Sequence, residues 1–178
     1  MTDANNGSTA SSTGYKSYLI VNNVQKNKNI KNMLISASSF GISEVFVVGQ
    51  KKFDLDEHRV FLDKLRCPIT RIASLKECRA YCQERQIRII GVEIMEGAQN
   101  ILDAPFQGDT AFIMGNEGSG MNAAQVAICD GFVYIPQYGG GTASLNVTVA
   151  ASIIMQSFAL WAGIPANPPV SQSTEAAS

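Results

Sequence analysis

Little in this sequence points to a metal centre or to a membrane. It contains one histidine, His58, which we interpret as a surface residue of a helix, and four cysteines without CxxC spacing. We therefore expect free thiols rather than zinc or disulfides, and no bound metal. The longest apolar stretch lies within 147–162, where four polar residues interrupt it. It fails as a membrane span, and we interpret it as a buried helix.

Both ends of the chain are poor in large apolar residues. Residues 1–14 contain no basic residue and no apolar run, which argues against a secretory signal or an Arg-rich transit peptide. Residues 163–178 are rich in Pro, Ser and Ala. We predict disordered tails at 1–14 and 163–178 and one folded domain over 15–162. The tails favour a cytoplasmic location, or a nuclear one.

Basic residues are absent from the second half of the chain. All 14 Lys and Arg lie between Lys16 and Arg88, together with seven acidic residues, so this segment carries a net charge of +7. Residues 89–178 contain seven acidic residues and no basic one. The first half can present a basic face to RNA. The alternative is a set of solvated helix faces whose charges are paired locally.

Apolar runs alternate with helical patterns along the folded part. The runs typical of strands are 17–22, 44–49, 68–72, 87–94, 110–114 and 131–136. Helices are predicted at 29–40, at 54–66, at 74–85 with Ser74 as its cap, after Gly120, and at 144–161. This alternation predicts an α/β protein with a parallel sheet.

Two glycine-rich loops follow strand-like runs near the end of the chain. The first, 115–120, reads GNEGSG, and the second, 136–144, contains three consecutive glycines. Ligands of open parallel sheets bind at the carboxyl ends of strands, so these loops predict a small-molecule site. The flanking side chains of Met114, Ile135 and Leu145 are placed to sandwich an adenine ring. The alternatives are an Asx-type turn in the first loop and plain helix capping by Ser144 or Asn146.

The two loops resemble motifs of a known family. The segments 112–120 and 135–152 resemble the second and third motifs, strand-GNEGxG and IPMxGxxxSLNVSVAAAI, of the SpoU (TrmH-like) class of SPOUT RNA methyltransferases. Asn29-Ile30, Ala37 and Phe40-Gly41, followed by EVFVVG, look like its first motif, NxGxxxRTAxxFG. The resemblance implies a Rossmann-like parallel sheet with a C-terminal trefoil knot, and a homodimer. It also implies S-adenosylmethionine as cofactor and methyl transfer to a ribose 2′-hydroxyl of tRNA or rRNA.

The resemblance also implies roles for individual residues. The positions carried over to cofactor binding are Met114, Gly115, Gly118, Ile135 and Leu145. Those carried over to the reaction centre are Asn29, Asn116, Glu117, Ser144 and Asn146.

One departure from the family pattern affects catalysis. The arginine of the first motif falls on Ile35, which can neither accept nor donate a proton. Lys31 lies four residues earlier on the same predicted helix face, and we hypothesise that its ammonium replaces the guanidinium. The alternative is that Lys31 is a solvated or phosphate-binding lysine without a catalytic role.

The sequence leaves three functions open. The first is an active RNA 2′-O-ribose methyltransferase. The second is a catalytically impaired homologue that acts as an RNA-binding or partner-dependent subunit, because of Ile35. The third is an ordinary doubly wound nucleotide-dependent enzyme, which is disfavoured because no GxGxxG or Walker A loop follows the first strand.

Overall fold

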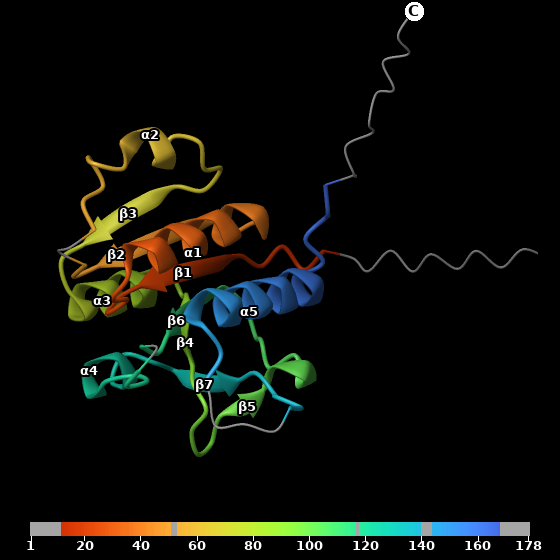
Figure 1. The fold of residues 1–178 in the computed structure, drawn as a ribbon. Coiled ribbons are helices and arrows are strands. Elements are labelled where there is room, and N and C mark those ends of the chain that lie inside the picture. The colour runs from red at the N-terminus through yellow and green to blue at the C-terminus, as the bar shows by residue number, and fades with distance from the viewer. Residues whose placement is uncertain (1–11, 51–52, 117, 140–143, 168–178) are drawn as a thin grey trace, which may run out of the picture.

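The computed structural model describes residues 12–50, 53–116, 118–139 and 144–167. These residues form a seven-stranded sheet in which all neighbouring strands pair in parallel (Figure 1). The strands are β1 (Ser17–Val21), β2 (Glu44–Val48), β3 (Ile69–Ile72), β4 (Arg88–Val92), β5 (Gln99–Asn100), β6 (Thr110–Met114) and β7 (Gly131–Tyr134). Their order across the sheet is β3-β2-β1-β6-β4-β7-β5.

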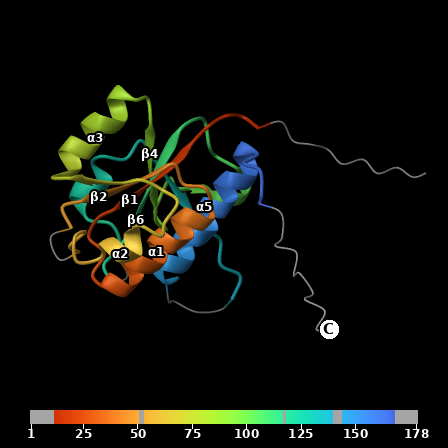
Figure 2. The ribbon, with the colours of Figure 1, turned by 90° about the horizontal axis from the view of Figure 1, so that it is seen from above.

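Helices cover both faces of this sheet. They are α1 (Asn27–Ser39), α2 (Arg59–Leu62), α3 (Leu75–Glu84), α4 (Ala123–Val126) and α5 (Val147–Ala162), with a 3-10 turn η1 (Ile101–Asp103) after β5. Figure 2 shows α1 and α5 side by side on one face and α3 on the opposite face. The fold is therefore three layered, as expected when helices connect parallel strands.

The central strands bury side chains on both faces. In β1, Leu19 and Val21 pack toward α1 and α5, whereas Ile20 packs toward α3. In β6, Phe112 and Ile113 divide between the two layers in the same way. Strands buried on both faces need continuous apolar runs, which explains why LIV and AFIM contain no alternating polar residue.

The expected α/β class with a parallel sheet is confirmed, and most element positions agree with the sequence pattern. Ser74 caps α3, as predicted, because its hydroxyl accepts the Glu77 N–H at 3.2 Å. Of the helix expected over 54–66, only Arg59–Leu62 (α2) is helical. Leu55 and Leu65, which contribute to the apolar pattern, pack on the core from non-helical segments before and after α2. The short, polar β5 gave no sequence signal.

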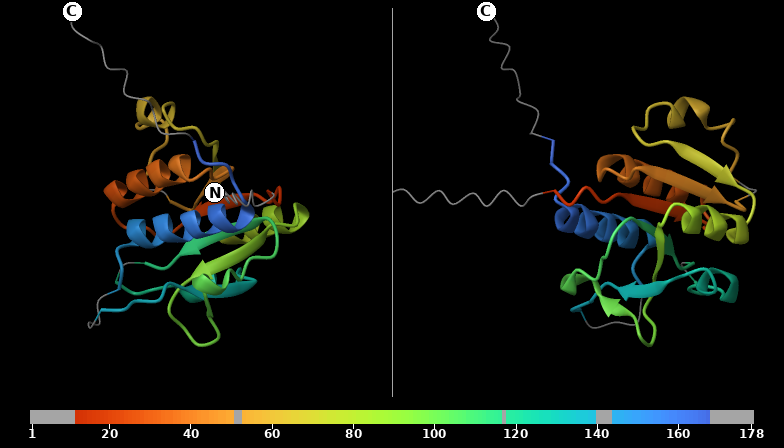
Figure 3. Two further views of the ribbon diagram at one scale, coloured as in Figure 1. Left: turned by 90° about the vertical axis from the view of Figure 1, so that its right-hand side faces the viewer. Right: turned by 180° about the vertical axis from the view of Figure 1, so that it is seen from behind.

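The two ends of the described chain lie beside each other at the end of α5 (Figure 3). The Thr13 N–H donates to the Ala162 carbonyl at 2.9 Å, and the Tyr15 ring stacks on Trp161 with centroids 5.6 Å apart. Ile164 packs against the core. A few residues just outside 15–162 thus contact the folded part, while most of both expected tails lies outside the described residues, and the domain limits stay a prediction.

Two expectations concern the knot and the membrane. The trefoil knot stays a prediction, since residues 140–143, between β7 and α5, lie outside the described residues. In the described part of the chain, no helix combines the length and apolar character needed to span a membrane.

Candidate active site

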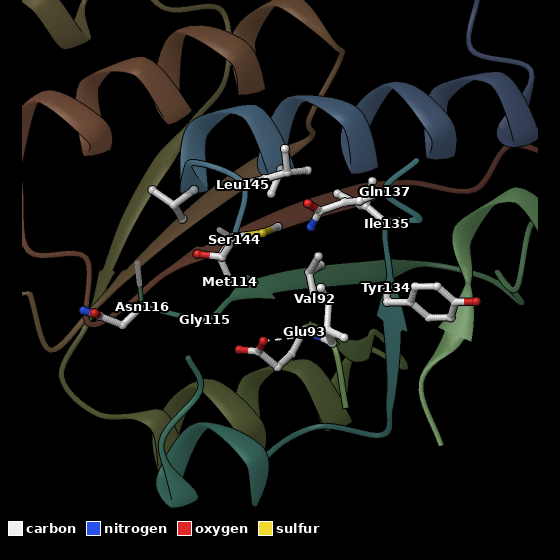
Figure 4. A pocket seen from close by; sticks show the side chains of 13 residues that line it. Val92, Glu93, Met114, Gly115, Asn116, Tyr134, Ile135, Gln137, Ser144 and Leu145 are labelled. Atoms are coloured by element: carbon white, nitrogen blue, oxygen red, sulfur yellow. Dashed lines mark hydrogen bonds between the residues drawn. The ribbon is translucent and has the colours of Figure 1, made fainter. Parts of the chain in front are cut away.

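A cavity opens where β4, β6 and β7 end and α5 begins (Figure 4). Its lining residues come from all four elements and from the segments that follow the strands. They are Val92, Glu93, Ile94, Met114, Gly115, Asn116, Tyr134, Ile135, Gln137, Ser144, Leu145, Val147 and Ala150. The two glycine-containing segments, which follow β6 and β7, therefore meet at one site, at the carboxyl edge where parallel sheets bind ligands.

The loop after β6 folds back on itself. The Asn116 N–H donates to the Gly120 carbonyl at 2.9 Å, and the Gly120 N–H donates to the Asn116 carbonyl at 3.0 Å. The Asn116 side-chain oxygen accepts the Gly118 N–H at 3.0 Å. Gly120 has a φ of +67°, a conformation that glycine adopts without strain. The loop is thereby held at the mouth of the cavity.

Asn116 also joins this loop to a second one. Its side-chain nitrogen donates to the Asn23 carbonyl, in the loop between β1 and α1, at 2.9 Å. Asn116 is only 9% exposed, so a missing partner would leave a polar group largely buried. This residue therefore fixes the position of one glycine-rich loop relative to the neighbouring strand end.

Glu93, directly after β4, is a cavity residue that the sequence analysis did not identify. Its Oε2 accepts the Met121 N–H at 3.0 Å, and its Oε1 accepts the Ile94 N–H at 3.1 Å. Among the described residues that line the cavity, only Glu93 carries a formal charge. A single carboxylate in a mostly apolar site favours a cationic ligand. An acidic residue at the end of a buried strand was the signal available in the sequence.

Glu93 also explains why two loop positions are glycine. A Cβ at Gly115 would collide with the Glu93 carboxylate and would lie 3.1 Å from both the Gly120 carbonyl carbon and the Met121 nitrogen. A Cβ at Gly120 would lie 2.8 Å from Glu93 Oε2. The carboxylate therefore occupies the space under the loop that any side chain would need.

The start of α5 forms the opposite wall. Ser144 is exposed and lines the cavity, and Leu145 is half-buried beside it. The Asn146 side chain caps the helix, because its oxygen accepts the Thr148 N–H at 2.9 Å. Together with Met114 and Ile135, Leu145 gives the cavity apolar walls on more than one side, which is the arrangement proposed for an adenine ring.

The remaining residues singled out from the sequence lie elsewhere. Asn29 is buried in the first turn of α1, and Gly118 is exposed on the outer part of its loop. The Lys31 ammonium lies 5.8 Å from the centre of the Phe61 ring in α2, and Lys31 does not line the cavity. Its catalytic role stays a prediction. Glu117 lies outside the described residues.

The cysteines and possible metal ligands show a separate pattern. All four cysteines are free thiols, and Cys78 and Cys82 are buried on one face of α3. Burial raises the pKa of the Cys129 thiol to about 12, so this group stays protonated at neutral pH. Within the described ranges, no cluster of three or more His, Cys, Asp or Glu side chains is placed to hold a metal ion.

Comparison with known proteins identifies the family. A sequence profile of the SpoU rRNA Methylase family matches residues 16–156. The chain belongs to this family.

Curated relatives include the 23S rRNA (guanosine-2′-O-)-methyltransferase RlmB of Vibrio vulnificus strain CMCP6, which is 30% identical over 143 residues, 77% of this chain and 56% of the relative. The 23S rRNA (guanosine(2553)-2′-O)-methyltransferase RlmP of Bacillus subtilis is 28% identical over 144 residues, 77% of this chain and 55% of the relative. The chain spans about half the length of these relatives.

Solved structures share the fold. A putative RNA methyltransferase of the TrmH family from Porphyromonas gingivalis superposes with a TM-score of 0.68 at 23% identity, covering 81% of this chain and 59% of that one. The SpoU methyltransferase AviRb from Streptomyces viridochromogenes, in complex with AdoMet, gives a TM-score of 0.67 at 24% identity, covering 80% and 58%. These likenesses show that the parallel sheet and its covering helices are a fold shared with these methyltransferases.

Proposed function

We propose that this protein is an S-adenosylmethionine-dependent RNA 2′-O-ribose methyltransferase. The cavity between the two glycine-rich segments carries the proposal, because it combines apolar walls, exposed backbone and the Glu93 carboxylate at the carboxyl edge of a parallel sheet. Membership of the SpoU family supports the reaction type, and the relatives named above are methyltransferases of this kind. They give no support to the impaired homologue that Ile35 raised as an alternative.

The residues of the cavity fit the proposed cofactor. Met114, Ile135 and Leu145 provide apolar contacts for the adenine ring, and the backbone at Gly115 is open to close approach. Glu93 offers a negative charge to the cationic end of the cofactor. When bound, S-adenosylmethionine supplies an electrophilic methyl group on its sulfonium.

The polar residues around the cavity fit the second substrate. Ser144 is exposed at the edge of the cavity, and Asn116 also lines it, with its amide directed away from Ser144 in Figure 4 and bonded to Asn23. Ser144 is placed to hold a ribose hydroxyl against the methyl donor, while Asn116 shapes the reaction centre by fixing the loop beside it, and positioning of this kind contributes a large part of catalysis. The roles proposed for Asn29, Glu117, Asn146 and Gly118 belong to the same proposal.

The charge distribution supports RNA as the partner. The segment from Lys16 to Arg88 holds every basic residue of the chain, and Lys26 and Lys28 are exposed at the start of α1. Basic residues bind the phosphate backbone and release counterions, so binding weakens as salt rises. A cytoplasmic location belongs to this proposal, because the relatives named above come from bacteria, which have no nucleus.

An apolar stripe on α1 and α5 supports the homodimer. Val149 is 47% exposed and Leu160 is 75% exposed, and with the half-buried Ile153 they follow one face of α5. Ile35 on the neighbouring α1 is 47% exposed. A seam of this spacing is typical of helix packing between subunits. A second copy of this chain would cover the stripe.

The test measures binding and transfer separately. Calorimetric titration with S-adenosylmethionine reports the cofactor site, and transfer of labelled methyl to total RNA, followed by mass spectrometry of the nucleosides, reports the reaction. Ile135→Trp, which fills the cavity, should abolish both, whereas Val60→Trp, on the exposed face of α2, should change neither. Cofactor binding without formation of any 2′-O-methylnucleoside would refute the proposed enzyme.

A further inference from the structure

A second cleft lies at the carboxyl ends of β1 and β2, beside the cavity described above. Five amide side chains line it, from three separate segments of the chain, and its volume is about 630 Å³. The amides belong to Asn22, Asn23, Gln25, Gln50 and Asn122. Leu75, at the start of α3, is half-buried in the same wall. The described lining therefore combines polar edges with an apolar surface and contains no charged side chain.

Two of these amides are fixed in place by the protein, but each leaves hydrogen-bonding capacity free. The Asn22 side-chain nitrogen donates to the Val48 carbonyl at 2.9 Å, and the Gln50 side-chain nitrogen donates to the Val24 carbonyl at 2.6 Å. An amide offers two N–H donors and an acceptor oxygen, so these bonds orient the groups without exhausting them.

Asn122 caps α4, because its side-chain oxygen accepts the Gln125 N–H at 2.9 Å. The two remaining amides, of Asn23 and Gln25, are less committed. Among the described residues, neither Asn23 nor Gln25 uses its side-chain amide in a hydrogen bond, and both side chains are exposed. Asn23 has a φ of +57°, a left-handed conformation that is uncommon outside glycine and in which asparagine is enriched. The chain therefore turns sharply here and presents two free amides within three residues.

The cleft is connected directly to the candidate active site. Asn116 lines the cavity and donates to the carbonyl of Asn23, which lines the cleft. Gln125, which is fully buried, donates to the carbonyls of Met114 and Asn22 at 3.3 and 3.5 Å. The two sites are thus separated by little more than one side chain, so a single extended ligand can occupy both.

The chemistry of the cleft selects among ligands. Among the described residues, the lining offers no cation to a phosphate, whereas paired amide donors and acceptors match the edge of a nucleobase. An apolar surface such as Leu75 suits the flat face of the base. In RNA, sequence is recognised mainly from unstacked bases that are hydrogen-bonded on their edges, and Lys26 and Lys28 follow Gln25 to hold the backbone.

We infer that this cleft binds a base of the substrate RNA adjacent to the methylated ribose, and so sets the sequence preference of the enzyme. The inference rests on the proposed function and adds to it the part of the chain that reads the RNA sequence. Amides at Asn23 and Gln25 provide the free hydrogen-bonding groups, and Asn116 places the base next to the reaction centre.

The experiment selects RNA from a pool of random single strands on the full chain and sequences the bound fraction. The unmodified protein should enrich a particular base at a fixed position. Gln25→Ala, and Asn23→Gly, which tolerates the left-handed backbone, should each reduce that enrichment about fivefold or more, the lower end of the discrimination that one amide–base pair supplies. Gln83→Ala, an exposed amide near the end of α3, is the matched control and should keep the enrichment.

Separate readouts distinguish this inference from the proposed function. Thermal unfolding and S-adenosylmethionine titration verify that each variant is folded with an intact cavity. Base enrichment that survives in both cleft variants, or that is missing from the unmodified protein, overturns the inference even if methyl transfer is normal. Enrichment that the cleft variants lose supports the inference even if methyl transfer is never detected, and that second result counts against the proposed function alone.

Discussion

The contact between Gly115 and Glu93 gives a sharp test of the site geometry. In Gly115→Ala, the new methyl group would occupy the position of the Glu93 carboxylate and press on backbone atoms at 3.1 Å. The carboxylate must then move and release the Met121 N–H, to which it is bonded at 3.0 Å. A hydrogen bond to a charged group contributes about 1.5–3 kcal/mol, so the free energy of unfolding should fall by roughly that amount.

The assay is a double-mutant cycle measured by thermal or denaturant unfolding. For a domain of this size, the loss corresponds to a decrease of about 3–12 °C in the melting temperature. In the Glu93→Ala background the collision with the carboxylate is gone and only the 3.1 Å backbone contacts remain, so the same Gly115→Ala change should cost less, about 1 kcal/mol. The cost of Gly120→Ala should fall less, because the φ of +67° at that position strains an alanine in either background.

An equal loss of unfolding free energy on Gly115→Ala, with and without the Glu93 carboxylate, would contradict the proposed collision. Independent sites add to within about 0.3–0.5 kcal/mol, so agreement inside that margin would mean that the carboxylate does not fill the space under the loop. Titration of the four proteins with S-adenosylmethionine completes the test. Gly115→Ala should weaken binding, because the displaced loop borders the cavity.

Three further changes test charge, assembly and stability. Glu93→Gln keeps the shape but removes the charge, and should reduce the preference for S-adenosylmethionine over the thioether S-adenosylhomocysteine, which lacks the sulfonium charge, by about fivefold to thirtyfold in calorimetry. Unit charges roughly 8–16 Å apart interact by about 1–2 kcal/mol at an effective dielectric constant near 20. An unchanged ratio would contradict a role for the charge of Glu93. Leu160→Glu should shift the mass found by sedimentation from dimer to monomer, and a monomeric unmodified protein would remove the interface proposed for α5. Although burial opposes ionisation of Asp130, the Arg79 guanidinium at 2.6 Å and the Ile89 N–H lower the pKa of its carboxyl group. The ionised Asp130 carboxylate therefore stabilises the fold above the unfolded pKa of about 3.9, and this stabilisation is lost as pH falls through the lower folded pKa. The difference in melting temperature between the unmodified protein and Asp130→Asn should shrink from about pH 7 toward about pH 3. A constant difference would count against the ion pair.

Local patterns made much of this fold predictable. The buried strands were visible as short apolar runs, and the cap of α3 followed from Ser74 with Glu77 three residues later. The loop after β6 was recognised from its glycines, which the crowding at Gly115 and the left-handed backbone at Gly120 account for. In each case the determining contacts are close in sequence or impose a residue type.

Contacts between distant segments gave no comparable signal. Asn116 and Asn23 are 93 residues apart, and Glu93 reaches Met121 across 28 residues. Neither sequence separation corresponds to the short spacings by which helices and strands are recognised, so these contacts become visible only in the folded structure. The helix expected over 54–66 was predicted too long for a different reason. Leu55 and Leu65 fit a helical apolar periodicity, but they pack on the core from non-helical segments on either side of α2.

The single amide of Asn116 has a mechanical consequence for the protein. The amide donates a hydrogen bond to the backbone carbonyl of Asn23, while the main chain of Asn116 closes the glycine-rich loop through its bonds with Gly120. Any displacement of Asn23 must therefore either move the glycine-rich loop as well or break the largely buried hydrogen bond from Asn116. A ligand bound in the cleft beside Asn23 can thus change the affinity of the cavity beside Asn116, and the reverse. By thermodynamic reciprocity, two ligands coupled in this way alter each other's affinity by the same factor.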